Sequence, residues 1–263
     1  MRTIHRAQGE VFFGKMSTNT VDFDRKRGTL HITKLALLAL MSLAVLALLF
    51  MIVKPVKVLP RLTQAPTYTL QDQNGEPFSD DNLRGKIVLY DFIYTSCTTV
   101  CPAMTGQMLQ VQQELAERGW LGDDVVLVSI TFDPERDTPE RLREYVAQMQ
   151  VSPEGWYWLT GDLMTIKQLV GGEFGVYFEK APLDEAAAEA AGLTPEERAD
   201  NYDFIHASVF VLVDGNGQIR AEYHELIDVD QILRDIELAV REKNAQGIGR
   251  LVRQAAHLVK AYP

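Results

Sequence analysis

The longest apolar segment of the chain runs from Leu35 to Val53, nineteen residues without a charged side chain. As a helix rising about 1.5 Å per residue, it would be roughly as long as a bilayer's hydrocarbon core is thick. A buried core helix rarely lacks polar residues altogether. A cleavable signal peptide has a shorter apolar stretch and a small-residue cleavage site, whereas Lys54-Pro55-Val56-Lys57 follows here. We therefore expect residues 35–53 to form an uncleaved transmembrane anchor.

Beyond residue 65, the apolar pattern predicts one domain of alternating strands and helices. Continuous apolar runs of strand length indicate buried strands, and Asn74-Gly75 indicates a β-hairpin before them. Apolar residues then recur every three or four positions, as in helices, and Gly171-Gly172 is expected to end the third helix. This order is typical of a layered α/β fold. The expected strands are 87–94, 125–132, 156–159, 208–213 and 218–225, and the expected helices are 104–119, 138–149, 162–170 and 229–243.

Three segments lie outside this alternation. Residues 54–65 are basic and contain proline, so we expect a tether. Residues 181–200 are rich in alanine and acidic residues and indicate a surface insertion, with a capping-box pattern at Thr194–Glu197. In the C-terminal extension 245–263, basic residues alternate with apolar ones. This extension is expected either to lie on a membrane surface or to pack on the domain.

Charge is divided unevenly along the chain. Residues 1–34 carry seven Lys/Arg and three Asp/Glu (net +4), and residues 54–263 carry 19 and 33 (net −14), which together give −10. An acidic main domain argues against nucleic-acid binding, which needs clustered basic residues. The N-terminal excess of basic residues favours a cytoplasmic tail at 1–34, with the main domain across the membrane.

The chain has two cysteines, Cys97 and Cys101, which follow the first buried strand. This number excludes a multi-bridge disulfide framework, a Cys₄ zinc site and a cubane iron–sulfur cluster within one chain. Their spacing brings both sulfurs to one side of a helix start, where the helix dipole favours a thiolate and where Pro102 suits the first helical position. The pair can exchange between dithiol and disulfide or chelate a soft metal such as Cu(I) or zinc. Two buried structural cysteines are the alternative.

A histidine and two aspartates could join this pair. His206 immediately precedes a buried strand and can reach the same sheet edge, although its position equally fits a structural histidine. Asp133 and Asp137 follow the second buried strand, where they form either a turn and helix cap or carboxylates that orient a ligand or handle a proton. The remaining histidines are less suited: two precede the anchor, one is expected to face solvent and one lies in the extension. They are His5, His31, His224 and His257.

In these motifs the chain resembles the SCO (SenC) family of copper-binding, thioredoxin-like proteins that assist cytochrome c oxidase assembly. The first motif is Asp91–Pro102, which contains CxxxCP, and the second is Ser129–Pro139, which contains DPxxDT. The third is His206 ahead of the apolar run that ends at Asp214. The resemblance spans roughly residues 64–240 and does not extend to the insertion or the C-terminal extension.

The resemblance implies a thioredoxin-like domain of the peroxiredoxin-like variant at 66–244, tethered by one N-terminal transmembrane helix. It implies that Cys97, Cys101 and His206 bind one copper ion, as Cu(I) or Cu(II), and that Asp133 and Asp137 support these ligands or tune their redox behaviour. The copper would be delivered to an oxidase subunit, or that subunit's thiols would be reduced. Other copper chaperones or thiol reductants are implied as further partners.

This interpretation places the chain in a bacterial inner membrane, with a single span and a periplasmic main domain, because cycling thiols belong in an oxidising compartment. On this view the protein is a metallochaperone rather than an enzyme. The alternative is a thiol–disulfide oxidoreductase, or a peroxiredoxin-like peroxidase, that uses Cys97 and Cys101 and does not need His206. A redox or copper sensor without a delivery role is a third possibility.

Overall fold

The computed structural model of the protein has two compact units, Met1–Lys57 and Val58–Pro263. It describes residues 34–49, 59–98, 100–183, 185–190, 192–194, 201–224 and 228–260, with the backbone alone at 187, 190 and 246–260. In the first unit, residues 34–49 are helical, and every leucine there is more than half exposed. Within the described residues, no helix has both the length and the apolar character needed to cross a membrane. Residues 50–53 of the predicted anchor lie outside the described part.

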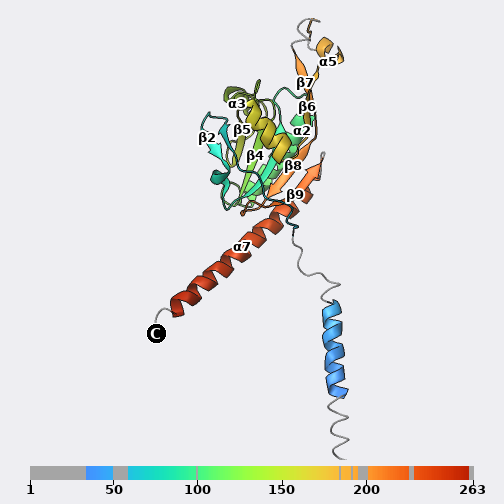
Figure 1. Cartoon of the computed structure of the whole chain (residues 1–263), viewed down its shortest axis with the longest axis vertical. Coiled ribbons are helices and arrows are strands. Elements are labelled where there is room, and N and C mark those ends of the chain that lie inside the picture. Colours follow the sequence, from blue (N-terminus) through green and yellow to red (C-terminus); the bar gives the residue numbers. More distant parts are fainter. Residues whose placement is uncertain are drawn as a thin grey trace, which may run out of the picture. The chain divides into compact units, whose positions relative to one another are not determined.

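The second unit is built on a seven-stranded mixed sheet with the order β2-β1-β5-β4-β3-β8-β9 (Figure 1). The three central strands β3, β4 and β5 are parallel, and β1 and β8 join them antiparallel. All residues of β3 and β4 are buried, which explains their unbroken apolar sequences. The predicted strands are therefore confirmed. The strands are β1 Thr69–Asp72, β2 Pro77–Ser79, β3 Ile87–Ile93, β4 Val125–Thr131, β5 Trp156–Thr160, β8 Val209–Val213 and β9 Ile219–His224.

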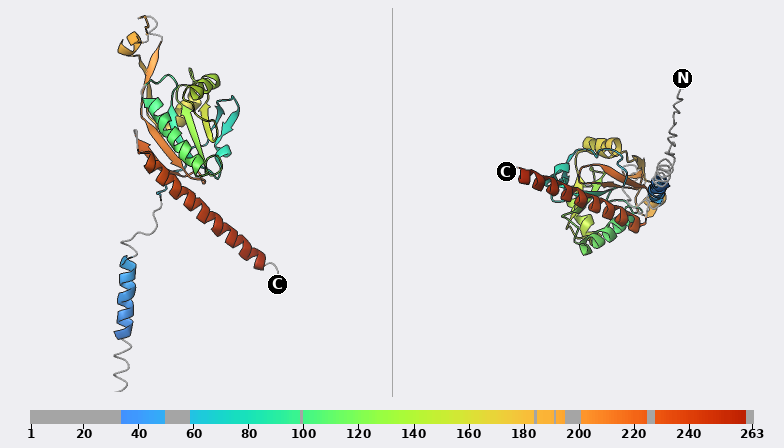
Figure 2. Two further views of the ribbon diagram at one scale, coloured as in Figure 1. Left: turned by 180° about the vertical axis from the view of Figure 1, so that it is seen from behind. Right: turned by 90° about the horizontal axis from the view of Figure 1, so that it is seen from below.

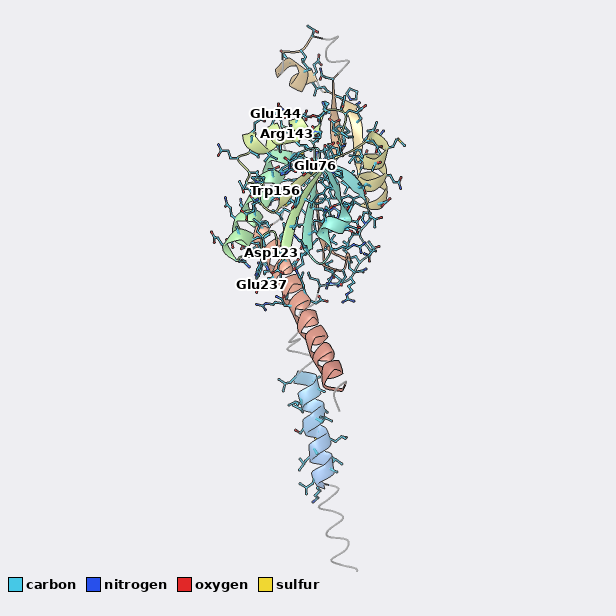
Figure 3. The ribbon with its side chains drawn as sticks, turned by 90° about the vertical axis from the view of Figure 1, so that its left-hand side faces the viewer. Glu76, Asp123, Arg143, Glu144, Trp156 and Glu237 are labelled. Carbon is cyan, nitrogen blue, oxygen red and sulfur yellow. The ribbon has the colours of Figure 1, made fainter. Side chains whose placement is uncertain are left out.

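Three helices pack on the sheet: α2 Val100–Glu117, α3 Pro139–Gln148 and the first part of α7 Val229–Lys260, which also packs on α2 (Figure 2). The hydroxyl of Tyr145 on α3 lies 3.2 Å from that of Thr105 on α2, and its ring contacts Trp158 of β5. Arg143, also on α3, donates to the Gln73 carbonyl in the β1–β2 turn (2.7 Å), so α3 reaches this end of the sheet (Figure 3). The predicted inward face of α2 is fully buried, namely Met104, Met108, Val111 and Leu115.

The third predicted helix differs from expectation. A short α-helix, α4 Leu163–Ile166, continues as a π-helix, η2 Lys167–Glu173, so the prediction that Gly171-Gly172 would end the helix is wrong. The left-handed glycine is Gly175 (φ +69°), after the helix. The π-helix is fixed by burial of its apolar side chains and by Phe174, whose ring packs against two aromatic rings of β3.

A separate two-stranded sheet pairs β6 Phe178–Pro182 with β7 Tyr202–His206, in antiparallel register. The predicted insertion lies at the far end of this hairpin, where α5 Glu185–Ala190 follows β6 (Figure 1). Residues 195–200, including part of the predicted capping box, lie outside the described part. These two strands were not predicted from the sequence, because their residues are partly exposed on both sides and show no simple alternation.

Two segments near the predicted domain boundaries are part of the folded unit. Within the predicted tether 54–65, the N–H groups of Leu62 and Ala65 donate to carbonyls at the start of β9 and in the turn before it (2.9 and 2.8 Å). At the other boundary, α7 continues through residue 245 without a break.

Candidate metal centre

The two cysteines lie where β3 ends and α2 begins, at the carboxyl edge of the parallel strands. Cys97 is in the connecting loop and is 5% exposed, and Cys101 is the second residue of α2 and is fully buried. The backbone N–H of Cys101 donates to the Cys97 sulfur over 3.4 Å. The loop and the first turn of α2 therefore bring the two cysteines into direct contact.

Two predicted details of this pair are corrected. Pro102 is the third residue of α2, not the first, although it still lies in the turn whose N–H groups have no helical partner. The hydrogen bond with Cys97, together with burial, holds the pKa of Cys101 far above its usual range. The helix N–H donates to the other sulfur, so the helix start stabilises negative charge on Cys97 and not on Cys101.

His206, the last residue of β7, completes the cluster. Its Nε2 lies 4.0 Å from the Cys101 sulfur, and its Nδ1 lies 3.2 Å from the Ala207 carbonyl. One ligand atom from each of Cys97, Cys101 and His206 lies within 4.8 Å of the others. Of the other histidines, His224 is exposed, as predicted.

Protonation of His206 depends on the same neighbours. Burial acts to lower the pKa of His206, but the hydrogen bond to Cys97 and the bond to the Ala207 carbonyl outweigh it, and the pKa is raised. A carbonyl at Nδ1 fixes the ring and leaves Nε2 directed at the cysteines, an arrangement often found in histidine metal ligands.

Aromatic rings surround the imidazole. The rings of Tyr94 and Phe132 have centroids 5.6 and 5.0 Å from the imidazole, and Phe204 packs against both of these rings. Such packing limits rotation of His206 and restricts water around the sulfurs. This arrangement could not be predicted from the sequence, because the three rings come from separate segments: Tyr94 follows β3, Phe132 follows β4 and Phe204 lies in β7.

Asp137 lies beneath the loop that carries Cys97. Its side chain is fully buried and accepts hydrogen bonds from the N–H and hydroxyl of Thr95 (3.0 and 2.5 Å) and from the hydroxyl of Thr131 (2.5 Å). Burial raises the pKa of Asp137, although these hydrogen bonds partly offset the effect. Asp137 therefore holds the loop two residues before Cys97 and does not itself contact a sulfur in the described contacts.

Asp133 contacts the β6–β7 hairpin, which carries His206. It accepts a hydrogen bond from the Tyr202 hydroxyl (2.8 Å) and pairs with Arg136, whose guanidinium also donates to the Tyr202 carbonyl (2.9 Å) and stacks on the Tyr202 ring. Tyr202 begins the strand that ends at His206. Asp133 thus fixes the start of β7 and, through it, the imidazole.

Three further residues of this site were not predicted from the sequence, namely Arg136, Tyr202 and Asp203. The hydroxyl of Tyr94 donates to the carboxylate of Asp203, which joins the cysteine loop to the hairpin. Arg136 lies within the DPxxDT segment, so its proximity to the aspartates could have suggested a role. Tyr202 and Asp203 lie outside the CxxxCP and DPxxDT motifs, and no other sequence pattern indicates a role for them.

Two sulfurs and one imidazole nitrogen form a soft donor set. Thiolates select Cu(I) and zinc, and imidazole suits copper in either common oxidation state. Two adjacent cysteine sulfurs can also be oxidised to a disulfide in a two-electron step. The arrangement can therefore hold a soft metal ion or exchange thiols.

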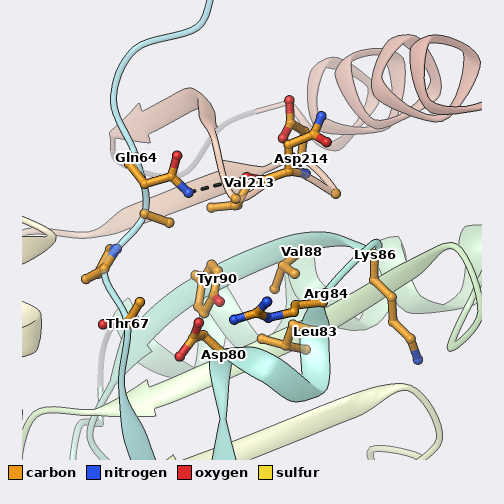
Figure 4. A pocket seen from close by; sticks show the side chains of 15 residues that line it. Gln64, Thr67, Asp80, Leu83, Arg84, Lys86, Val88, Tyr90, Val213 and Asp214 are labelled. Atoms are coloured by element: carbon orange, nitrogen blue, oxygen red, sulfur yellow. Dashed lines mark hydrogen bonds between the residues drawn. The ribbon is translucent and has the colours of Figure 1, made fainter. Parts of the chain in front are cut away.

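A cavity of about 400 Å³ lies at the opposite end of β3 from the cysteines (Figure 4). Charged side chains of both signs line it, among them Asp80, Arg84, Lys86 and Asp214, with Tyr90 also lining it. None of its described lining residues is a cysteine or histidine, so it is distinct from the metal-ligand cluster.

The SCO1/SenC family model matches residues 59–241. A SCO1/SenC family lipoprotein from Bacillus anthracis is 28% identical, with a TM-score of 0.57, and the match covers 70% of this chain and 99% of that one. BsSco, a member of the Sco family of cytochrome c oxidase assembly proteins with a disulfide switch, is 29% identical (TM-score 0.54; 71% and 98% covered). Copper-bound ScoI from Arabidopsis thaliana is 26% identical (TM-score 0.55; 68% and 98% covered).

These likenesses confirm the predicted thioredoxin-like α/β fold. The matched segment begins just before the pairing of residues 62–65 with β9 and ends within α7, so it includes the whole sheet and the cysteine–histidine cluster. By fold, by motif and by the extent of the match, the chain belongs to the SCO1/SenC family.

Proposed function

We propose that this protein binds one copper ion through Cys97, Cys101 and His206 and assists copper-site assembly of cytochrome c oxidase. The observation that carries the proposal is the approach of three soft ligand atoms to within 4.8 Å of one another. Two relatives add support: ScoI has been solved with copper bound, and BsSco belongs to a family of oxidase assembly proteins.

The donor set suits transfer of an ion better than permanent storage. Structural metal sites commonly have four protein ligands, whereas three leave a coordination position for an incoming group. A thiolate of the receiving oxidase subunit could occupy that position while the ion is passed on. The aromatic packing around His206 would restrict water and keep the sulfurs from adventitious oxidation.

Asp133 and Asp137 are proposed to position these ligands without binding copper. Asp137 holds the loop before Cys97 through Thr95, and Asp133 holds the start of β7 through Tyr202. Such supporting groups commonly change metal affinity by about 10- to 100-fold when they are removed.

We further propose that residues 35–53 anchor the chain in a bacterial inner membrane, with 1–34 cytoplasmic and the main domain, 66–244, periplasmic. The charge-free sequence, the exposed leucines of the helix at 34–49 and the basic N-terminal tail support this arrangement. Residues 54–65, the last of which pair with β9 and the turn before it, would join the anchor to the domain. The oxidase subunit that receives copper, other copper chaperones and thiol reductants would be partners on the periplasmic side.

The proposal is tested by Cu(I) titration of the reduced full-length protein in detergent against a competing chelator. We expect one copper ion per chain, no stoichiometric binding after Cys97→Ser and Cys101→Ser together, and a loss of at least about tenfold in affinity for His206→Ala. The matched control is His224→Ala, since that histidine is exposed on β9. Stoichiometric copper binding that survived removal of both cysteines would contradict the proposal.

A thiol–disulfide oxidoreductase remains the second candidate, because the Cys101 N–H bond to the Cys97 sulfur would stabilise an attacking thiolate. Oxidase activity in cells separates the two functions. A reductase needs both cysteines but not His206, so normal oxidase assembly with His206→Ala, and none with either cysteine replaced, would favour it. Equal loss in all three variants favours copper delivery.

A further inference from the structure

We propose that residues 246–260, the C-terminal half of α7, form a basic amphipathic helix that binds the surface of an anionic lipid membrane. The first half of α7 is packed against the domain. Its inward residues Ile232, Leu233, Ile236, Ala239 and Val240 are buried, and Lys243 pairs with Asp124 (2.7 Å). The helix then continues past the sheet to Lys260 (Figure 2).

The sequence of this second half has the pattern of a surface-seeking helix. On an α-helix, residues three, four and seven apart share a face. The apolar residues that share one face are Ile248, Leu251, Val252, Ala255, Leu258 and Val259. The residues of the opposite face are Arg250, Arg253, His257 and Lys260. An apolar face opposed by a basic one is characteristic of helices that lie in a membrane interface.

The positive charge of the C-terminal segment indicates that its partner is an anionic lipid. The segment 245–263 has three Lys/Arg and no Asp/Glu, whereas residues 54–263 as a whole carry 19 and 33. An acidic domain is repelled by an anionic surface, so the basic helix supplies the attraction that the rest of the domain lacks. A zwitterionic surface would give the basic face no such advantage.

Two other occupants of the apolar face are less favoured. Packing on the domain's own core is not supported, because the C-terminal half of α7 runs on away from the sheet (Figure 2). Pairing with a second copy as a coiled coil needs apolar heptads over a longer stretch than these residues provide. The SCO1/SenC match ends at residue 241, so the family fold does not require the segment.

The test uses the fragment 59–263, which contains every residue of the hydrophobic core, Tyr68 to Val240, and therefore folds without the anchor. Its flotation with vesicles of phosphatidylglycerol is compared with that of the fragment 59–244 and with vesicles of phosphatidylcholine alone. We expect 59–263 to bind the anionic vesicles at least about tenfold more strongly than 59–244 does, and to lose this advantage at high salt. Copper is not needed, so the result is independent of the proposed function.

Variants separate the two faces. Leu251→Glu with Leu258→Glu should abolish vesicle binding, and Arg250→Gln with Arg253→Gln should weaken it about tenfold. Gln254→Ala, between the faces, is the control and should bind normally. Equal flotation of the two fragments, or equal binding to both lipids, would overturn the inference. So would a concentration-dependent dimer of 59–263 that fails to float, because the face would then bind a second copy.

Discussion

Asp91 lies in the middle of β3, between Ser129 of β4 and Phe210 of β8 in the strand register, and is fully buried. Neither carboxyl oxygen makes a hydrogen bond of normal geometry. Burial raises the pKa of Asp91 to about 7, and the neighbouring Ser129 hydroxyl offsets the effect only in part. A buried charge without good partners is costly, so this residue should weaken the fold at neutral pH.

The sign of the pH dependence follows from the raised pKa. Folded Asp91 keeps its proton up to about pH 7, whereas the unfolded carboxyl loses it near pH 4. The free energy of unfolding should therefore fall as pH rises from about 4 to 7, by up to about 1.4 kcal/mol per pH unit from this group.

Asp91→Asn should remove this component and stabilise the protein at pH 8, by an amount on the order of 4 kcal/mol. The measurement is urea unfolding of the reduced fragment 59–263 at pH 5 and pH 8. Asp123→Asn, in an exposed turn, is the control and should leave the pH dependence as it is. An unchanged slope for Asp91→Asn would show that Asp91 is not protonated in the folded state.

At the scale of elements, the β6–β7 hairpin brings His206 to the cysteines. It is linked to the main domain through Tyr202–Asp133, through Tyr94–Asp203 and through the aromatic contacts of the imidazole with Phe132 and Tyr94. The strand that ends at His206 is thus aligned by side chains at its start and middle. Changes at Tyr202 should reach the metal site even though Tyr202 is four residues from the ligand.

Tyr202→Phe removes the hydroxyl that donates to Asp133 and keeps the ring that stacks on Arg136. We expect a loss of stability of about 1–2 kcal/mol and a several-fold decrease in Cu(I) affinity, measured by thermal unfolding and chelator competition. The matched control is Tyr177→Phe, because the Tyr177 hydroxyl donates to Glu179 in an exposed pair. A fall in stability without any change in Cu(I) affinity would mean that the Tyr202–Asp133 hydrogen bond stabilises the fold but does not position the copper ligands.

At the scale of the whole domain, Arg220 of β9 joins the first residues of the domain to its last helix. Its buried guanidinium donates to the carbonyls of Leu59 (2.6 Å) and Pro60 (2.8 Å). The same group forms ion pairs with Asp214 and Glu242, both at 2.8 Å. Glu242 lies on α7, so one side chain connects the start of the domain with its last helix. These interactions lower the pKa of Glu242 despite the opposing effect of its burial.

Arg220→Met should cost about 3–5 kcal/mol, because it leaves buried Asp214 without its cation. Urea unfolding of the fragment 59–263 measures the loss. Arg241→Gln breaks an exposed pair with Glu237 on the same helix and should change stability by less than about 0.5 kcal/mol. Similar losses for the two variants would mean that the buried pairs contribute no more than surface ones.

Local pattern was enough for much of the architecture. The unbroken apolar sequences of β3 and β4 predicted central strands, because burial on both faces leaves no polar position. The spacing from Met104 to Leu115 predicted the buried face of α2, because burial on one side of a helix repeats every three or four residues. The cysteine pair could also be identified locally, since two residues four positions apart at the start of a helix cannot lie far apart. The motifs around it were sufficient to indicate the family.

The tertiary structure determined the long-range contacts, which the hydrophobic periodicity of the sequence does not encode. The Cys101 sulfur and the His206 imidazole approach across 105 residues of sequence, and Asp137 reaches Thr95 across 42. Strands β6 and β7 escaped prediction because they pair with each other outside the main sheet and are half exposed. Periodicity reports whether a residue is buried but not which strands are neighbours. The order of the strands, and with it the meeting of the three soft ligands, is therefore fixed by long-range packing alone.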